Sequence, residues 1–209
     1  MSTAHGITLK AGLRSARAGE EGPPRAGRVG RLLGRALALV DRRMNRRALD
    51  LLEPMENDRI LEVGFGPGEL VRMLEAGQPV ARVAGVDVSR AALRRARRRN
   101  AAGIRRGRVD LRLAPVSRLP FPDQSFDKAA AVHGFRHWDD PLAGLAELRR
   151  VLKPLGILVL GLQAGRFWRP LRRAHHEAAL GGAMILLRQA GFDCRRVGQS
   201  LVLAQRPEF

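Results

Sequence analysis

Tyrosine is absent from this chain of 209 residues, which also has only one cysteine and three lysines. The lone cysteine, Cys194, excludes a disulfide framework within one chain and is typical of a reducing compartment. Long apolar runs are missing too, since the stretches Leu155–Leu162 and Ala178–Leu187 are too short to span a bilayer. The first 27 residues are too polar for a signal peptide. These absences predict a cytoplasmic protein.

Acidic residues are scarce as well: 38 Lys and Arg stand against 20 Asp and Glu, which gives a net charge of +18. Such an excess is what nucleic acids or anionic membrane surfaces attract. However, 35 of the 38 basic residues are Arg, a bias that a GC-rich coding sequence produces without any selection for binding. The longest cluster, within Arg94–Arg99, fits the solvated face of a helix. Nucleic acid or a membrane surface therefore stays open as a partner but is not favoured.

The length suits one main domain with two N-terminal additions. Residues 1–27 show no hydrophobic periodicity and are expected to be a disordered basic tail. Residues 28–57 carry apolar side chains at helical spacing from Val29 to Leu52, with arginines between them. This pattern predicts helices that cap the main domain, and a basic amphipathic segment on an anionic membrane is the alternative. The main domain is expected over residues 58–209.

A glycine-rich segment is the most informative feature that is present. Ile60–Val63 reads as a short buried strand, and Gly64, Gly66 and Gly68 follow it directly. A helix is expected from about Glu69, with Leu70, Val71 and Leu74 facing the sheet. A second apolar run, Val83–Val86, ends on Asp87, where an acid can accept both hydroxyl hydrogens of a ribose. The two segments together predict a nucleoside-cofactor site.

The glycine spacing bears on which nucleoside is bound. Dinucleotide sites use G-x-G-x-x-G, whereas this chain has G-x-G-x-G followed by Glu69. A carboxylate at the start of the helix would repel a pyrophosphate, so a ligand without phosphate fits better. Glu62, at the end of the first strand, could accept a ligand ammonium instead.

Five segments in order carry a resemblance to a known family: ILEVGFGPG, VAGVDVS, LRLAPVSRLPFPDQSFD, AAAVHGF and LAELRRVLKPLGILVL. On these the chain resembles class I S-adenosylmethionine-dependent methyltransferases, and the third and fifth segments are most like the small-molecule branch that includes quinone-biosynthesis enzymes. The resemblance implies an α/β fold: a doubly wound, Rossmann-like, seven-stranded sheet with a reversed final strand and helices on both faces. A helix over 171–190 and a hairpin of Phe192–Val197 with Leu201–Gln205 would complete it.

Cofactor contacts follow from the same resemblance. It assigns Glu62 and the loop with Gly64, Phe65, Gly66 and Gly68 to the methionine half, Asp87 to the ribose, and Val88 and Ser89 to the adenine. Pro115 and Val116 fall in the loop that holds the adenine ring. Pro115 stands where the family usually has an acid, so weaker cofactor binding is expected, by roughly one hydrogen bond of 0.5–1.5 kcal/mol. Leu155 replaces the first residue of a usual Gly-Gly pair.

The chemistry implied is in-line transfer of an activated methyl group, which leaves S-adenosylhomocysteine and needs no metal. His133, at the end of the fourth strand, could act as a base or contact the cofactor, or merely cap the strand and line the pocket. His137 could face the substrate, while Trp138 is expected to pack. His175 and His176 have no convincing metal-ligand spacing, so no metal site is predicted.

The absence of several motifs narrows the range of possible methyl acceptors. No Asn-Pro-Pro-Tyr run follows the fourth strand, Cys194 lies far from the expected cleft, and a lysine-centred ribose site is not expected with three lysines. A small acceptor with an oxygen, nitrogen or carbon nucleophile remains, including lipophilic ones. The alternatives are a methyltransferase for RNA or membrane lipid that uses the basic surface, and a non-catalytic protein with the cofactor fold.

Overall fold

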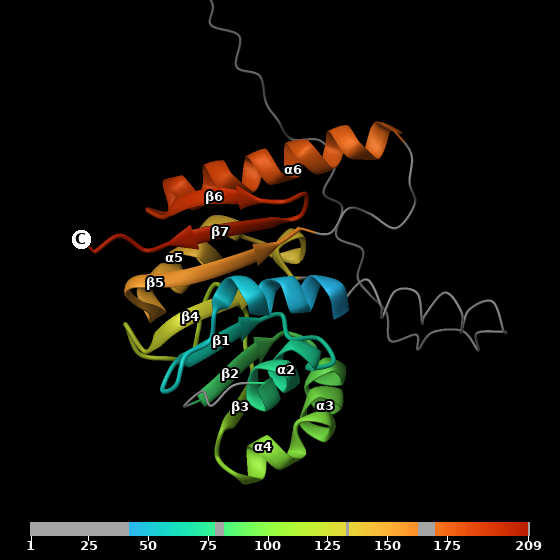
Figure 1. Cartoon of the computed structure of the whole chain (residues 1–209), viewed down its shortest axis with the longest axis vertical. Helices are drawn as coiled ribbons and strands as arrows, with labels where there is room; N and C mark the ends of the chain where they lie inside the picture. The colour runs from blue at the N-terminus through green and yellow to red at the C-terminus, as the bar shows by residue number, and fades with distance from the viewer. Residues whose placement is uncertain (1–41, 78–81, 133, 163–169, 209) are drawn as a thin grey trace, which may run out of the picture. The chain divides into compact units, whose positions relative to one another are not determined.

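The computed structural model describes residues 42–77, 82–132, 134–162 and 170–208, with the backbone alone for 170–174 (Figure 1). All of them belong to one compact unit, Leu39–Phe209. The predicted tail at 1–27, residues 28–41 of the predicted cap region and His133 lie outside the described residues. None of the helices in the described ranges is long and apolar enough to cross a membrane.

Seven strands form a single sheet in the order β3-β2-β1-β4-β5-β7-β6. The strands are β1 (Arg59–Val63), β2 (Arg82–Asp87), β3 (Val109–Leu113), β4 (Phe126–Ala131), β5 (Leu152–Gly161), β6 (Asp193–Val197) and β7 (Leu201–Gln205). The first five run parallel, and β7 runs antiparallel to both β5 and β6. The predicted doubly wound sheet with a reversed final strand is therefore confirmed.

Helices cover both faces of the sheet. They are α2 (Glu69–Gly77), α3 (Arg90–Arg99), α4 (Ala101–Arg105), α5 (Pro141–Val151) and α6 (Pro170–Gln189), with a short 3-10 turn η1 (Phe135–His137); residues 42–52 are helical as well. The helix over 42–52, α2 and α3 bury their apolar residues on one face, while α5 and α6 do so on the other. Figure 1 shows the blue helix over 42–52 in front of the sheet and α5 behind it.

Helix boundaries follow the local chemistry of the sequence. The Asp140 side chain accepts a hydrogen bond from the Ala143 N–H at 3.0 Å, and Pro141 occupies the first turn of α5. The chain leaves α6 through Gly191, whose φ of +80° is readily adopted by glycine. The late helix ending before Gly191 was predicted over 171–190 from sequence, and the structure confirms it as Pro170–Gln189.

The connection between β3 and β4 packs on the same side of the sheet as α5, and an arginine of that helix makes most of its side-chain bonds to the connection. The Arg150 guanidinium of α5 donates to Glu147 at 2.7 Å, to Asp123 at 2.7 Å and to the carbonyls of Leu119 and Phe121. Glu147 in turn accepts the Leu119 N–H at 2.7 Å. This network stabilises the loop that carries residues 114–116 toward the candidate site.

Leu155 adopts a backbone conformation that suits glycine. Its φ is +63°, and its side chain is 54% exposed, so burial of the side chain does little to offset the strain. We expect Leu155→Gly to stabilise the protein by roughly 0.5–1 kcal/mol, because relief of strain outweighs the added freedom of the unfolded chain. Chemical denaturation measures this difference. Equal or lower stability of the variant would show that the backbone at Leu155 is not strained.

Candidate functional site

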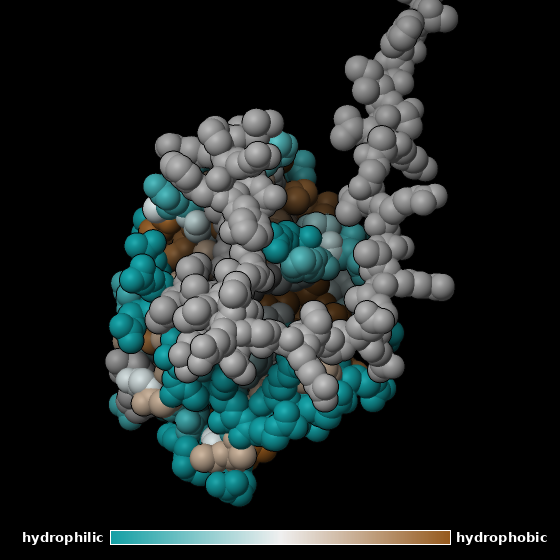
Figure 2. All heavy atoms as spheres, turned by 90° about the vertical axis from the view of Figure 1, so that its right-hand side faces the viewer, coloured by the Kyte–Doolittle hydropathy of each residue, from teal (hydrophilic) through white to brown (hydrophobic). Residues whose placement is uncertain are grey.

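A cavity of about 320 Å³ opens at the carboxyl ends of β1 and β2. This is the edge at which ligands bind in doubly wound sheets. Four segments form its walls: the glycine loop, the end of β2, the loop after β3 and the loop after β4. The lining residues are Val63, Gly64, Gly66, Val86, Asp87, Val88, Ala114, Val116, Gly134, His137, Trp138 and Asp139. Figure 2 views the molecule from this edge, and apolar side chains are visible there between hydrophilic ones.

Asp87 fastens the glycine loop to the end of β2. One carboxylate oxygen accepts the Gly66 N–H at 2.8 Å, and the other accepts the Ser89 N–H at 2.8 Å. The Gly64 N–H also donates to the Val86 carbonyl at 2.8 Å. Because a carboxylate oxygen can accept more than one hydrogen bond, Asp87 retains capacity for ligand hydroxyls. The predicted pairing of the loop with this acid is thus present in the geometry.

Gly68 is required for close packing of the loop on α3. Its φ is +76°, and a Cβ there would lie 2.8 Å from the Ala96 Cβ and 3.0 Å from the Ala96 Cα. The buried Asn100 side chain donates to the Gly68 carbonyl at 3.0 Å and to the Ala96 carbonyl at 2.9 Å. Asn100 thus ties the end of α3 to the loop. Sequence reasoning missed it, because an asparagine after a run of arginines gives no local signal of this contact.

Glu62, a residue of β1, has its side chain buried beside the start of α2. Burial raises the pKa of its carboxyl to about 8, the Val71 N–H opposes this shift, and the charge of Asp87 adds to it. Its Oε2 atom has no hydrogen-bond partner within the described part of the chain. Glu62 does not line the 320 Å³ cavity. However, its buried Oε2 atom could accept a hydrogen bond from a donor group of a ligand.

The pH dependence of the free energy of unfolding tests whether burial raises the pKa of Glu62. A carboxyl whose pKa is raised from 4.5 to about 8 stabilises the fold below pH 4.5, and that contribution is lost as the pH rises through about 8. We therefore expect Glu62→Gln, which cannot titrate, to become progressively more stable than wild type over this interval. Denaturant unfolding without ligand measures the trend. Glu147, whose pKa is lowered by its bond from Arg150, contributes stability above pH 4.5 that is lost as the pH falls below this value, so Glu147→Gln should be less stable than wild type above pH 4.5 and approach it in more acidic solution.

Glu69 does not act as sequence analysis expected. Its carboxylate pairs with Arg72 at 3.0 Å, Arg99 at 3.3 Å and Arg42 at 3.6 Å. The hydrogen bond from Arg72 is the main cause that lowers the pKa of Glu69. Because three arginines balance its charge, Glu69 is not an effective source of repulsion against a phosphate.

Part of the cavity wall is apolar. Val88, 72% exposed, Ala114 and Val116 lie on it beside the partly buried Trp138. Trp138 packs edge-on against Phe135 with ring centroids 5.0 Å apart, so it both packs, as predicted, and faces the cavity. Pro115 is exposed and lies off the wall, between the two lining residues Ala114 and Val116.

Of the residues predicted to contact the cofactor, some line the cavity and others lie elsewhere in the fold. Gly64, Gly66, Asp87, Val88 and Val116 line the cavity. Phe65 is buried in the core against Gly85, and the Ser89 hydroxyl caps α3 through the Ala92 N–H at 3.2 Å. The wall also holds seven residues that were not assigned to the cofactor from sequence: Val63, Val86, Ala114, Gly134, His137, Trp138 and Asp139. The last four follow β4, so the end of that strand was the signal available for them.

The predicted role of His133 stays a prediction, since this residue lies outside the described part. His137 is exposed on the cavity wall, and its Nε2 accepts a hydrogen bond from the Arg136 Nε at 3.2 Å. Across the described ranges, no cluster of three His, Cys, Asp or Glu residues could hold a metal ion.

Known proteins resemble this chain over the same region. The family described as "Methyltransferase domain" matches residues 61–160. A ubiquinone/menaquinone biosynthesis C-methyltransferase of Geobacter sulfurreducens is 34% identical over 122 residues, 58% of this chain and 48% of that protein. A demethylmenaquinone methyltransferase of Thermus thermophilus is 41% identical over 130 residues, 62% of this chain and 58% of that protein. The chain thus spans about half the length of these two relatives.

Two further comparisons extend the likeness. An uncharacterized methyltransferase of Bacillus subtilis is 30% identical over 132 residues, which cover 63% of this chain and 71% of that protein. The solved structure of a SAM-dependent methyltransferase from Aquifex aeolicus has a TM-score of 0.60 at 21% identity, over 77% of this chain and 87% of that one. The structural likeness supports the fold alone.

Proposed function

Because this chain belongs to the family of S-adenosylmethionine-dependent methyltransferases, we propose that it transfers the methyl group of that cofactor to a small, lipophilic acceptor. The observation that carries the proposal is the cavity in which Asp87 holds the glycine loop open at the carboxyl edge of the sheet.

The residues present fit the cofactor. Asp87 would accept the ribose hydroxyls, and Val88, Ala114 and Val116 offer an apolar wall for the adenine. The glycine loop leaves room for the methionine half, since a Cβ at Gly66 would meet nothing within 4 Å. The unpartnered Oε2 of Glu62, beneath the loop, suits an ammonium group.

Bound S-adenosylmethionine supplies a methyl group that is already activated by its sulfonium. The protein then has to orient the acceptor and exclude water, which can contribute up to about 7–11 kcal/mol to lowering the barrier. Trp138 and Val116 shield one side of the cavity. Where the acceptor must lose a proton, His137 on the wall and the predicted His133 are the candidate bases.

The nature of the acceptor is supported by the relatives and by the wall. One relative is named as a ubiquinone/menaquinone biosynthesis C-methyltransferase and another as a demethylmenaquinone methyltransferase, which favours a small lipophilic acceptor here too. The alternative acceptors, RNA and membrane lipid, would use the basic face of α3. Part of that face serves the fold, because Arg97 donates to the Leu111 carbonyl and Arg99 pairs with Glu69.

Two measurements test the proposal. Calorimetric titration with S-adenosylhomocysteine should show one site with micromolar affinity. Incubation with methyl-labelled S-adenosylmethionine and a panel of phenols, quinols and amines should then label an acceptor. Binding without transfer to any acceptor, including RNA and lipid, would favour a non-catalytic protein, and absence of binding would refute the proposal.

A further inference from the structure

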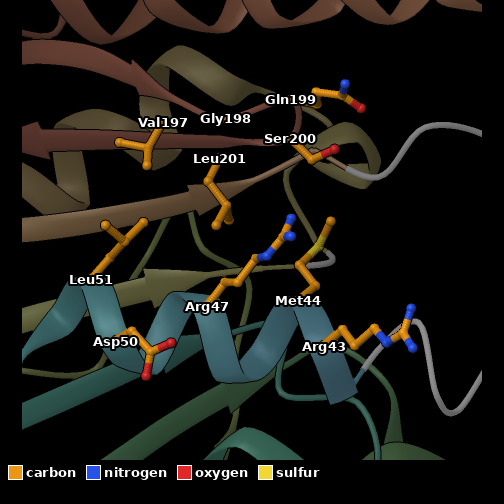
Figure 3. A pocket seen from close by; sticks show the side chains of 10 residues that line it. All are labelled: Arg43, Met44, Arg47, Asp50, Leu51, Val197, Gly198, Gln199, Ser200 and Leu201. Atoms are coloured by element: carbon orange, nitrogen blue, oxygen red, sulfur yellow. The ribbon is translucent and has the colours of Figure 1, made fainter.

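A second cavity, of about 770 Å³, lies between the helix over 42–52 and the β6–β7 hairpin (Figure 3). Met44, Leu51, Val197 and Leu201 give it apolar walls. The hairpin turn is held in place by α6, because the His176 Nε2 donates to the Gln199 carbonyl at 2.7 Å. The cavity is therefore formed by packed elements on both sides.

Two arginines give this cavity a positive side. Arg43 and Arg47 stand one helical turn apart, both exposed, and like charges at this spacing repel each other. Neither forms an ion pair with any residue of the described ranges, whereas the adjacent Arg42 reaches Glu69 at 3.6 Å. Asp50 also lines the cavity, but in Figure 3 its carboxylate points away from the hairpin while Arg47 extends toward it. An anionic group beside Arg47 and Arg43 would relieve their repulsion.

The cavity opens at the same edge of the sheet as the glycine loop. Leu201 pairs with Gly161 at the carboxyl end of β5, and the Leu162 N–H donates to the Ser200 carbonyl at 2.8 Å. From β1 to β7 the order is β1-β4-β5-β7, which is three strand spacings or about 14 Å. One small molecule can bridge that separation.

We propose that this second cavity binds the far end of the methyl acceptor, and that this end carries a carboxylate or another anionic group. Apolar walls hold the body of the molecule, and Arg47, with Arg43, holds the anion about 10–15 Å from the glycine loop. The acceptor is then an amphipathic anion rather than a neutral lipophile. This inference rests on the proposed methyl transfer, because only then does the glycine loop mark the reacting end.

The test compares two probes on the protein saturated with S-adenosylhomocysteine: naphthalene-2-carboxylate and its uncharged carboxamide. Calorimetry should show that the carboxylate binds about tenfold more tightly than the amide. Arg47→Gln should remove that preference, while Arg46→Gln, an exposed change on the same helix but off the cavity, should leave it intact. S-adenosylhomocysteine affinity should be the same in all three proteins.

Equal binding of the two probes to wild type, or a preference that survives Arg47→Gln, would overturn the inference. A separate experiment measures binding of the protein to vesicles of anionic phosphatidylglycerol. If Arg47→Gln weakened vesicle binding and the free carboxylate showed no preference, a membrane surface would be the ligand and the inference would again be wrong. Loss of S-adenosylhomocysteine binding in wild type would instead refute the proposed function, so the two failures are distinguishable.

Discussion

Replacing Asp87 with alanine is expected to weaken S-adenosylhomocysteine binding by at least about 100-fold. Two effects combine. The variant loses the carboxylate that would accept the ribose hydroxyls, each worth roughly 1.5–3 kcal/mol as a hydrogen bond to a charged group. It also loses the bond at 2.8 Å that fastens Gly66 to the end of β2, so the loop is no longer held open. Calorimetric titration measures the change in affinity.

The matched control is Asp110→Ala. Asp110 is exposed on the neighbouring strand and pairs with Arg112 at 2.7 Å, so its loss changes the net charge equally without touching the cavity. Affinity of this control should equal that of wild type. Thermal unfolding of both variants shows whether weaker binding results from a lost contact or from loss of the fold. Asp87→Asn keeps the side-chain shape without the carboxylate, so its affinity for S-adenosylhomocysteine gives a second measure of what the carboxylate contributes. Unchanged affinity in a folded Asp87→Ala protein would remove Asp87 from the site.

Gly68→Ala is expected to destabilise the protein by roughly 2–5 kcal/mol. The new Cβ would meet Ala96 at 2.8–3.0 Å, in a helix that cannot withdraw without breaking the bonds of Asn100. The positive φ adds about 1–2 kcal/mol of strain. For a protein of this size, the midpoint of thermal unfolding should fall by about 10 °C.

The variant Gly66→Ala separates the effect of backbone strain from the effect of a steric clash. Gly66 also has a positive φ, of +51°, but a Cβ there meets nothing within 4 Å. This variant should therefore lose only about 1–2 kcal/mol. If the two alanine variants were equally stable, the packing of Gly68 on α3 would not be the reason for glycine at that position.

The parts of the fold with strong local signals were predictable from sequence. The apolar run before Gly64, the acid ending the run at Val83–Val86 and the glycine after α6 each determine a boundary through neighbouring residues. The hairpin of β6 and β7 was predicted within one residue. Such features depend on periodicity and turn chemistry, which act over a few positions of the chain.

The site was less predictable, because its details depend on contacts between distant segments. Glu69 looked like a free negative charge, but two of its three arginine partners, Arg42 and Arg99, come from other helices. Asn100 reaches the glycine loop across 32 positions of the chain. Pro115 matched a family position, yet it lies off the wall, which Ala114 and the predicted Val116 line instead. Each of these outcomes follows from packing rather than from local pattern.

The cofactor site is tested most directly by titrating S-adenosylhomocysteine into isotope-labelled protein and following backbone amide resonances. Placement of the ligand at the carboxyl edge of β1 and β2 predicts large shifts at Gly64, Gly66, Val88 and Gly134, with little change at Arg46 or in β6. Saturation without shifts in the glycine loop, or shifts centred on another surface, would contradict the assignment of this cavity to the cofactor.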